Sequence, residues 1–458
     1  MKKKFIYLTY EIFRREFDSK ILMAIIAATR GYHVVLGDLR EDIDFNLPEG
    51  FYFHKDHGVG ADKRFKRWKK NNAIIGSLDE EGLITGNLDW YQRVRINKVA
   101  LDLSDFVFLW GKHQRSLFNE NTLIDDNFVV TGHPRFDLLK REDFSVNKVT
   151  KILVNTRFTK ANPMGTFDHL VNVWKKSGYI NSLDEENALI EERDKEKFIL
   201  DEFHHFINSS LKETSEVKIT LRCHPAESEE YYKELYKNEP RVIVDRDTPL
   251  FQQLRNSDVV LHDGCTTGIE AASLGVPVVG LRPKIENYDY GEFANQFSLN
   301  FESHQALHQY IFNDFNMVDF SQLYDQVSHS TLEMINNWKG GGAINKILDT
   351  ISQVELKLVD IHELMKVKEK VIIKKLLLKN YYKVIGRLLG VKISSLGVKK
   401  LGLYLNELKM VEELSPEVSI KEIKERVSMI LNICNLKFKT DDFIFHKLSN
   451  KSVIISLR

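Results

Sequence analysis

Cysteine is scarce in this chain of 458 residues, and neither sign of charge is in excess. The three cysteines, Cys223, Cys265 and Cys434, form no disulfide framework and have no metal-ligand spacing, which fits a reducing compartment. Lysine plus arginine and aspartate plus glutamate both total 65, so no overall positive field indicates nucleic acid as a partner.

Long apolar runs are also missing. No run of eighteen apolar residues occurs, so we expect no segment to span a bilayer. The N-terminal stretch "MKKKFIYLTYEIF" contains Glu11 and is followed by more charged residues, which favours a first β-strand over a signal peptide. These absences predict a cytoplasmic protein.

Strand-like and helix-like segments alternate through most of the chain, and 43% of the residues are hydrophobic, enough for large cores. Apolar runs at 4–10 and 33–38 flank a helical segment at 18–31, which has Asp18 near its start and Gly31 just past its end. This is the pattern of a βαβ unit. Continuous apolar strands indicate a parallel sheet covered on both faces.

The alternation is interrupted by a polar segment near residue 145 and then restarts. We therefore expect an α/β protein with two Rossmann-like domains, at 1–143 and 148–300. Helices at 301–353 are expected to pack back across the first domain. Residues 354–458 are expected to form a basic, mostly helical extension, which beyond 400 looks like a small α/β appendage. Two such domains facing a cleft are typical of the GT-B architecture.

The extension carries the one strong charge asymmetry. Between Lys366 and Lys400 there are eleven basic residues and a single acid, Glu369. A helix that is apolar on one side and basic on the other is either a packed helix with a solvated face or a peripheral helix. The second interpretation predicts binding to an anionic membrane surface or to a partner through 366–400.

Three stretches place reactive side chains just after predicted strands, where open parallel sheets bind ligands. The first is "SLDEEGLI" at 77–84. Asp79, Glu80 and Glu81 are adjacent carboxylates, whose repulsion is expected to raise at least one pKa toward that of a general base. A solvated acidic loop is the alternative.

The second stretch is "LRCHPAESEEYY" at 221–232. Pro225 restricts His224 to an extended backbone at the end of a strand, close to the positive end of the next helix. An imidazole there could donate to a phosphate or protonate a departing one. Glu227 would cap that helix or contact a ribose. A plain turn is the alternative, and a second His-Pro pair at 133–134 is interpreted as the exit from the first domain.

The third stretch is "VVLHDGCTTGIEAASLGVPVVGL" at 259–281. A turn containing Gly264 leads into a helix that begins with Thr266 and Thr267, whose hydroxyls and backbone N–H groups make an anion site. Glu270 lies one turn further on, where a ribose could be held. An ordinary helix cap followed by a buried helix is the alternative.

In this order, these stretches resemble the bacterial surface carbohydrate biosynthesis protein family, a GT-B group. The similarity covers roughly residues 4–340 and is also carried by "YEIFRREFDSKILMAIIAATRGYHVVLGD", "FLWG" and "TGHPRFDLL". More distantly, the chain resembles bacterial sialyltransferases, polysialyltransferases and Kdo transferases. Those enzymes share three motifs, which are matched here by Glu80-Glu81-Gly82, His224-Pro225 and Thr266-Thr267.

The resemblance implies a glycosyltransferase that moves an acidic sugar, Kdo before sialic-type sugars, from a CMP-activated donor to a surface polysaccharide or lipid-linked glycan. Glu80 or Glu81 would be the base and His224 would stabilise the leaving CMP, with no metal or other cofactor required. The resemblance leads us to expect asparagine at the position of Asp263. The aspartate would either cap the turn or act as a nucleophile in a retaining reaction. Donor contacts are expected from the following residues: Arg222, Pro225, Glu227, Gly264, Thr266, Thr267 and Glu270.

An acidic sugar also needs a cationic partner for its carboxylate. Arginines near predicted strand ends are the candidates, and nearby acids are expected to contact sugar hydroxyls. The predicted acceptor- or sugar-binding residues are Glu11, Arg14, Arg15, Asp18, Asp79 and Arg157, with Arg222 a further candidate for the carboxylate. A cluster of charges at a helix start is the alternative for the residues between 11 and 18.

Three other functions stay open. A phosphotransferase of the teichoic-acid type, using a CDP-activated polyol, would use the same histidine and hydroxyls. A UDP-sugar GT-B enzyme or epimerase is the second. A non-catalytic GT-B-like scaffold in a surface-polysaccharide complex is the third.

Overall fold

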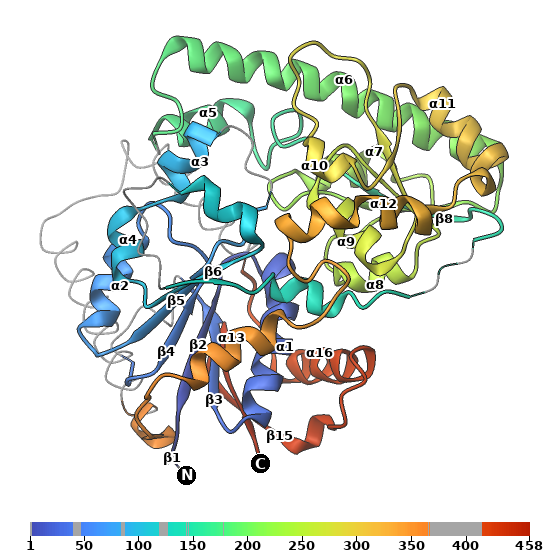
Figure 1. The fold of residues 1–458 in the computed structure, drawn as a ribbon. Coiled ribbons are helices and arrows are strands. Elements are labelled where there is room, and N and C mark those ends of the chain that lie inside the picture. Colours follow the sequence, from blue (N-terminus) through green and yellow to red (C-terminus); the bar gives the residue numbers. More distant parts are fainter. Residues whose placement is uncertain are drawn as a thin grey trace, which may run out of the picture. The chain divides into compact units, whose positions relative to one another are not determined.

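Two β-sheets, each with helices packed against it, organise the chain (Figure 1). The computed structural model describes residues 2–39, 47–83, 88–118, 127–142, 144, 146–176, 178–364, 366 and 415–458. Unit 1 consists of Met1–Gly82, Asn87–Leu138 and Gly342–Arg458, and unit 2 of Leu83–Gly86 and Leu139–Gly341. The predicted class of two Rossmann-like α/β domains is confirmed. Within the described ranges, no helix combines the length and apolar character that crossing a lipid bilayer requires.

The sheet of unit 1 has the strand order β15-β16-β3-β2-β4-β5-β6-β7. Its strands from β3 to β7 are parallel, whereas β16 and β15 are antiparallel additions at one edge. The bounds are β2 (Phe5–Tyr10), β3 (His33–Asp38), β4 (Phe51–His54), β5 (Ile74–Leu78), β6 (Phe106–Leu109), β7 (Phe128–Val130), β15 (Phe443–Ser449) and β16 (Ser452–Leu457). A separate pair joins β1 (Lys2–Lys3) to β14 (Val359–Asp360).

The helices of unit 1 cover both faces of this sheet. Strands β2 and β3 are therefore buried along their whole length. Their bounds are α1 (Phe13–Thr29), α2 (Ala61–Lys69), α3 (Leu88–Arg95), α4 (Lys98–Leu103), α13 (Ala343–Ser352), α16 (Ile420–Ile433), and the short helices η1 (Lys112–Leu117), η4 (Pro134–Leu138) and η7 (Thr440–Asp442). Helices α3 and α4 are separate, because Asn97 caps the start of α4 by accepting from the N–H of Ala100.

Helix α1 begins five residues before the predicted start at Asp18. The rings of Phe13 and Phe17 lie 4.2 Å apart and both pack against Tyr10, so the extra turn is stabilised by aromatic burial. Asp18 therefore lies inside the helix instead of near its start. Gly31 has a φ of +92° just past the helix end, as predicted.

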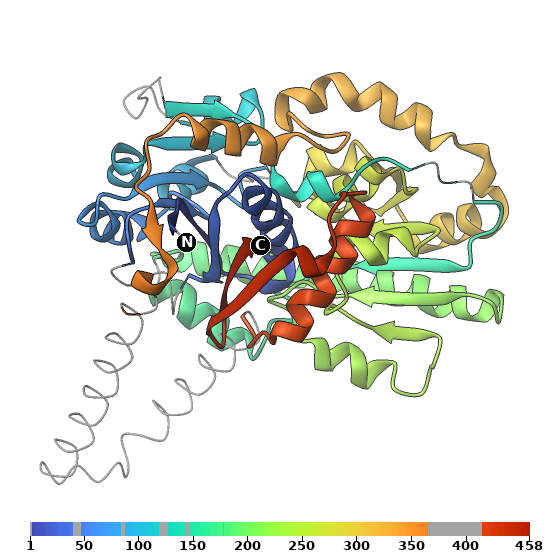
Figure 2. The same ribbon diagram turned by 90° about the horizontal axis from the view of Figure 1, so that it is seen from below.

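The end of the chain is part of unit 1. Strand β16 pairs antiparallel with β3, and α16 packs against α1, as Figure 2 shows in red and blue. Asp137 caps α13 by accepting from the N–H groups of Ala343 and Ile344. The described residues of 342–364 and 415–458, which the sequence divided between crossing helices and an extension, thus group with the first sheet. The predicted basic segment lies, from residue 367 on, outside the described residues.

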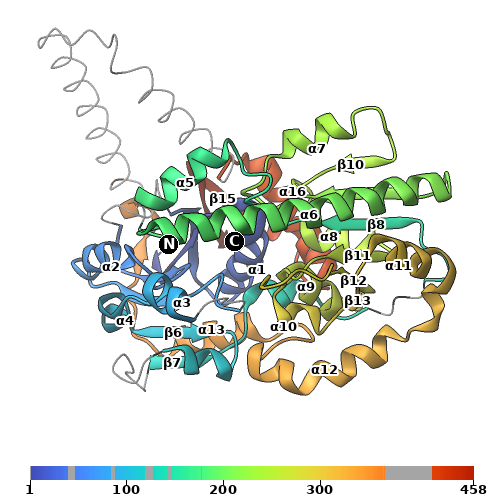
Figure 3. The same cartoon turned by 90° about the horizontal axis from the view of Figure 1, so that it is seen from above.

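The sheet of unit 2 is wholly parallel, with the order β10-β9-β8-β11-β12-β13. Its strands are β8 (Lys151–Asn155), β9 (Lys218–Arg222), β10 (Val242–Val244), β11 (Val259–His262), β12 (Val278–Leu281) and β13 (Leu299–Phe301). Its helices are α5 (Phe167–Lys176), α6 (Leu183–Glu213), α7 (Glu229–Leu235), α8 (Leu250–Arg255), α9 (Thr266–Leu274), α10 (Glu292–Asn295), α11 (His304–Gln309), η5 (Tyr310–Asp314), η6 (Phe315–Met317) and α12 (Phe320–Met334). The long helix α6, green in Figure 3, packs against β12 and α11.

Candidate functional site

Strand β8 is the centre of the candidate site in unit 2. It lies between β9 and β11, and the carboxyl ends of these three parallel strands share one edge of the sheet. The His224 turn follows β9, and the Thr266-Thr267 helix start follows β11. Because neighbouring strands are about 4.8 Å apart, the two motifs begin about 10 Å from each other. Asn155 ends β8, and Thr156 and Arg157 come directly after it, at the strand end between the two motifs.

Asn155 connects β8 to the start of α9. Its Nδ2 donates to Cys265 Sγ at 3.1 Å, and its Oδ1 accepts from Thr267 Oγ1 at 3.2 Å. Thr267 is buried and Thr266 is half-buried. The N-cap residue, Cys265, makes no side-chain hydrogen bond to the first turn, so its side chain does not cap the N–H groups there. Asn155 thus orients a helix N-terminus at the edge of the sheet.

His262 shapes the turn that precedes α9. Its Nδ1 accepts from the N–H groups of Gly264 and Cys265 at 3.0 and 3.1 Å, so its proton is on Nε2, which donates to Ser298 Oγ at 2.6 Å. Burial lowers the pKa of His262 to about 3, which keeps the ring neutral. A β-carbon at Gly268 would lie 2.4 Å from this ring, so glycine is required there.

Arg157 and Asp263 form an ion pair on the same edge. Arg157 Nε lies 3.1 and 3.0 Å from the two carboxylate oxygens, and Nη2 donates to the carbonyl of Asp289. The Asp263 side chain has no exposure, whereas 26% of the Arg157 side chain is exposed. This gives Asp263 the geometry of a group that holds an arginine at the edge, rather than that of an exposed nucleophile.

Gly264, another predicted donor residue, lies where the chain approaches the loop after β12. Its φ is +132°, and a β-carbon would fall 1.4 Å from the carbonyl oxygen of Tyr290. Asn295 Nδ2 donates to that same carbonyl and to the carbonyl of Asp263, at 2.6 and 3.4 Å. The turn and the loop are therefore held in contact.

Thr156 connects β8 to the His224 turn through Glu227. The hydroxyl of Thr156 donates to Glu227 Oε2 at 2.8 Å, and the N–H of His224 donates to Oε1 at 3.2 Å. The N–H of Ala226 donates to His224 Nδ1, so the neutral imidazole carries its proton on Nε2. His224 and Pro225 are half-buried, whereas Glu227 is fully buried. Glu227 therefore acts on the turn and does not cap α7, which Ser228 caps.

The remaining predicted donor residues are buried. Arg222 Nη1 donates to the carbonyl of Thr248 and to Gln253 Oε1, both at 2.8 Å, so its guanidinium anchors the loop before α8. Glu270 lies in α9 and is 3% exposed. The described contacts of Arg222 are thus with protein groups.

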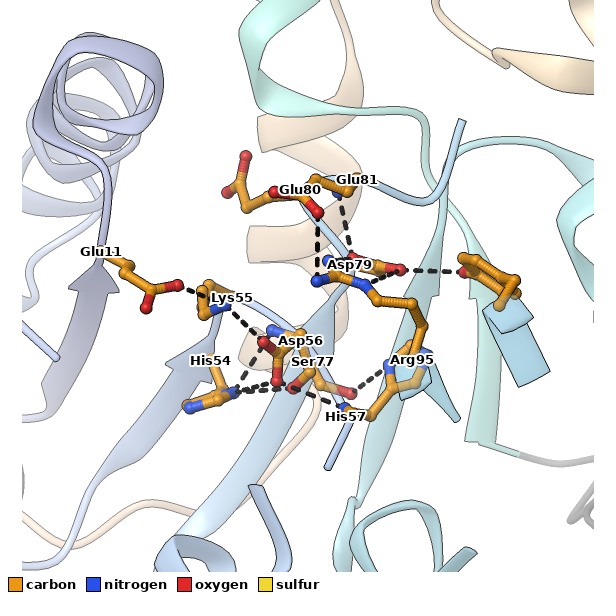
Figure 4. A network of polar contacts seen from close by, with 12 residues as sticks. Glu11, His54, Lys55, Asp56, His57, Ser77, Asp79, Glu80, Glu81 and Arg95 are labelled. Atoms are coloured by element: carbon orange, nitrogen blue, oxygen red, sulfur yellow. Dashed lines mark hydrogen bonds and ion pairs between the residues drawn. The ribbon is translucent and has the colours of Figure 1, made fainter. Parts of the chain in front are cut away.

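A charged network follows β2, β4 and β5 of unit 1 (Figure 4). Asp79 is buried; Arg95 forms an ion pair with it and Tyr91 OH donates to it at 2.9 Å. Glu81 is 46% exposed and is paired with Arg15 at 2.6 Å and with Arg95 at 3.2 Å. Of the three predicted carboxylates, Glu81 is the one with substantial exposure.

Glu80 is the centre of a separate, buried ionic cluster. Its side chain is 1% exposed, and its oxygens lie 2.8 Å from Lys20 Nζ and 2.9 Å from His133 Nε2. Arg135 is a third partner at 3.3 Å. His133, read in the sequence as part of an exit segment, stacks on Trp110 with ring centroids 4.0 Å apart. An ionised carboxylate with three such partners is typical of a structural ion cluster.

For Glu80 and Glu81, the expectation of a raised pKa is wrong. Burial alone would raise the pKa of Glu80, but Lys20, His133 and Arg135 outweigh it and hold the pKa well below its usual range. The charge of Arg15 lowers the pKa of Glu81 to about 2. The sequence shows the carboxylates side by side, whereas the fold surrounds them with cations from distant segments.

Of the other predicted acceptor- or sugar-binding residues, Arg157 lies in unit 2, whereas Glu11, Arg14, Arg15 and Asp18 lie in unit 1. Glu11 is paired with Lys55 at 2.5 Å, and Arg15 also contacts Glu16. Asp18 is buried and accepts from Arg426 of α16 at 2.7 Å. Arg14 is half-buried on α1.

Several residues of both edges were missed in the sequence. Those in unit 2 are Asn155, Thr156 and His262, and those in unit 1 are Lys20, Lys55, Arg95, His133 and Arg135. The polar run "NTR" directly after the apolar "KILV" is the one signal that could have identified the β8 residues. Among the described residues, no group of three or more histidine, cysteine, aspartate or glutamate side chains is placed to hold a metal ion.

No family model and no curated protein matches the chain. Solved structures with a similar backbone fold include UDP-GlcNAc 2-epimerase from Neisseria meningitidis bound to UDP-GlcNAc. Its sequence is 14% identical, the match covers 77% of this chain and 100% of that chain, and the TM-score is 0.45. The S. aureus MnaA-UDP co-structure is 15% identical, with 77% and 96% covered and a TM-score of 0.44. The wall teichoic acid polymerase TagF with CDPG is 12% identical, with 81% and 90% covered and a TM-score of 0.46.

Proposed function

We propose that the protein is a glycosyltransferase that binds the nucleotide phosphate of its activated sugar donor at the carboxyl edge of the unit 2 sheet. One observation supports this most: the end of β8 connects the His224 turn to the Thr266-Thr267 helix start, through Thr156 and Glu227 on one side and Asn155 on the other. An imidazole, a guanidinium and a helix N-terminus then share one edge. These are groups that bind phosphate.

His224 would assist the departure of the nucleotide. Since its Nδ1 accepts from the backbone, its Nε2–H can donate to a phosphate oxygen. In the transfer, the bond between the anomeric carbon and the phosphate oxygen breaks, and the nucleotide leaves with the electron pair. The anomeric carbon bonds to the acceptor oxygen, whose proton goes to a base. A hydrogen bond from Nε2–H, with the proton remaining on the ring, would stabilise the charge on the leaving phosphate.

The charges of the edge favour a donor with one phosphate. Arg157 is neutralised by Asp263, and burial raises the pKa of Glu227 to about 8, so this carboxyl is mostly protonated at neutral pH. The described groups therefore supply little surplus positive charge. At the phosphate position a CMP-activated sugar carries one negative charge and a diphosphate donor carries two, so the CMP form needs less positive charge there. We propose an acidic sugar, Kdo before sialic-type sugars, as the group that is transferred.

A donor with two phosphates is the second candidate. Thr266 and the first turn of α9 lie on one side of β8 and His224 on the other, about 10 Å apart by strand spacing. A pyrophosphate could contact both. This arrangement would suit a CDP-activated polyol or a UDP-sugar.

We propose Glu81 as the base for the acceptor hydroxyl, because it is the partly exposed member of the acidic stretch. Its ion pair with Arg15 holds its pKa near 2, so an acceptor would have to displace Arg15 before Glu81 could take a proton. A lipid-linked or polysaccharide acceptor of the bacterial surface is the expected substrate.

Nucleotide-induced stabilisation tests this function. The full chain is heated with CMP, CDP, UMP or UDP at up to millimolar concentration, and its Tm is compared with that of the chain alone. A nucleotide at a hundred times its Kd should stabilise the folded state by about 2.7 kcal/mol. We expect CMP to give the largest shift. A larger shift with CDP or UDP would favour the second candidate, and no shift with any of the four would refute a nucleotide site.

A further inference from the structure

Glu227 occupies a buried position between two elements of the candidate site. Its side chain has no solvent exposure. Oε2 lies 2.7 Å from Tyr232 OH and 2.8 Å from Thr156 Oγ1, and Oε1 accepts from the N–H of His224 at 3.2 Å. One carboxyl thus joins the end of β8, the first turn of α7 and the histidine turn.

The described partners of this carboxyl are neutral. Two are hydroxyls and one is a backbone N–H, and none of these contacts is with a cation. Ion pairs elsewhere in the chain supply the compensation that a buried carboxylate needs, as Lys160 does for Glu196 at 2.8 Å. Burial raises the pKa of Glu227 to about 8, outweighing the hydrogen bonds with Tyr232, Thr156 and His224, which lower it.

Charged and titratable groups on the adjoining elements do not change this balance. Arg246 donates through Nη1 to the backbone carbonyl of Glu227, and its Nε lies 3.2 Å from Glu229. Glu196 of α6 is an acid and raises the pKa of Glu227 further. Cys223 at the end of β9 and Tyr232 have pKa values raised by burial, which keeps both neutral.

We propose that Glu227 is the positioning residue for His224 and that it acts in its protonated form. In this form Oε2–H donates to Tyr232 OH, Tyr232 OH donates to Thr156 Oγ1 at the end of β8, and Oε1 accepts from Thr156 Oγ1 and from the His224 N–H. The direction of His224 Nε2 is thereby set by the same strand that orients Arg157 and the start of α9. This inference rests on the proposed function for its consequence in binding, but its geometry can be tested without a nucleotide.

Substitution by glutamine, Glu227→Gln, separates the neutral from the charged form. Glutamine keeps a carbonyl oxygen for the His224 N–H and presents an amide that can donate to Thr156 or Tyr232, as a protonated carboxyl does. Glu227→Ala removes all three contacts. Glu234→Gln is the matched control, because Glu234 is an exposed acid on the same helix, α7.

Two measurements on the full chain are needed. The first is the ¹⁵N spectrum of the His224 imidazole without nucleotide, assigned by comparison with His224→Asn. The second is a titration with CMP. Glu227→Ala should shift the His224 signals and weaken CMP binding about tenfold or more, the loss expected for a broken buried hydrogen-bond network. Glu227→Gln should restore the wild-type His224 signals and most of that affinity, and Glu234→Gln should match the wild type.

Each other outcome overturns a defined part of the proposal. If Glu227→Gln shifts the His224 signals as much as alanine does, the carboxyl acts as an anion. If the alanine variant folds and leaves those signals in place, Glu227 does not position His224. If alanine fails to fold, the glutamine variant still decides, together with Tyr232→Phe, which removes one donor. Absence of CMP binding by the wild type would refute the proposed CMP donor and leave the imidazole result standing.

Discussion

Thr267 Oγ1 lies 3.2 Å from Asn155 Oδ1, and this hydrogen bond joins the start of α9 to the end of β8. The two residues are 112 positions apart in the chain. On the other side of the strand, a second hydrogen bond joins Thr156 to Glu227. The end of β8 thus sets the separation of two motifs that the sequence presents as independent.

Removal of the Asn155 side chain should loosen the start of α9. Asn155→Ala eliminates the bonds to Thr267 and Cys265, and we expect CMP affinity to fall about tenfold, or about 1.4 kcal/mol, which is the net value of one or two such bonds. Isothermal titration calorimetry measures it. Asn172→Ala, on the exposed surface of α5, is the control. Equal affinity in both variants would show that Asn155 has no part in the site.

His224 should matter for binding and not for folding. Its imidazole is half-buried at the end of a turn, so His224→Ala should leave the Tm within about 2 °C of the wild type, as surface substitutions usually do. CMP affinity should fall about tenfold, the value of a charge-assisted hydrogen bond. His169→Ala, a half-buried histidine of α5 in the same unit, is the control. A large loss of Tm without a change in affinity would make His224 a structural residue.

Substitutions of Glu80 and Glu81 should have different effects, on stability for Glu80 and on the rate of sugar transfer for Glu81. Glu80→Gln leaves Lys20 and Arg135 without their carboxylate, and breaking such a buried ion pair costs about 3–5 kcal/mol of unfolding free energy. Glu81→Gln should keep the Tm and lower the rate of sugar transfer about 100-fold or more, the contribution of a general base. Thermal unfolding and a transfer assay on both variants measure this. A stable but inactive Glu80→Gln protein would instead make Glu80 the base.

The last strand should be required for the stability of unit 1. Ile454 of β16 is fully buried in a core shared with Phe5, Val35 and Tyr52. Ile454→Ala should therefore lower the unfolding free energy by about 2–5 kcal/mol, as large-to-small core substitutions do. Lys447→Ala, on an exposed position of β15, should change it by less than about 0.5 kcal/mol. Urea denaturation followed by circular dichroism compares them. Equal midpoints would show that this hairpin adds little to the fold.

Protonation of Glu227 predicts a specific pH dependence of stability. Its pKa is about 8 in the folded chain and about 4.3 when unfolded, so between these values the folded state keeps a proton that the unfolded state has released. Glu227 should therefore reduce stability progressively as pH rises from about 4.3 to 8 and level off above. Calorimetry at pH 5 to 9 should show the Tm of the wild type falling relative to that of Glu227→Gln through this window. A constant difference would mean that Glu227 is ionised throughout.

The order of elements and the edges where reactive groups lie could be predicted from the sequence. Apolar runs, glycines past helix ends and polar residues after strands are local signals, so the strand-end positions of His224 and Thr266 could be predicted from the residues alone, whereas Asp263 was singled out through the family resemblance. The same local signals misjudged Asp18, because the start of α1 depends on the packing of Phe13 and Phe17 on Tyr10. They also gave the wrong pKa direction for Glu80 and Glu81.

By itself, the sequence determined two α/β units and the chemical nature of the groups at their strand ends, because backbone periodicity and turn propensity act within a few residues. Only the tertiary structure decided which of those groups meet. Lys20 reaches Glu80, Arg426 reaches Asp18 and Asn155 reaches Thr267 because strand order brings distant segments together. Burial and ion pairing act over a few ångströms in space, whatever the separation along the chain, and they set the charge state of each site residue.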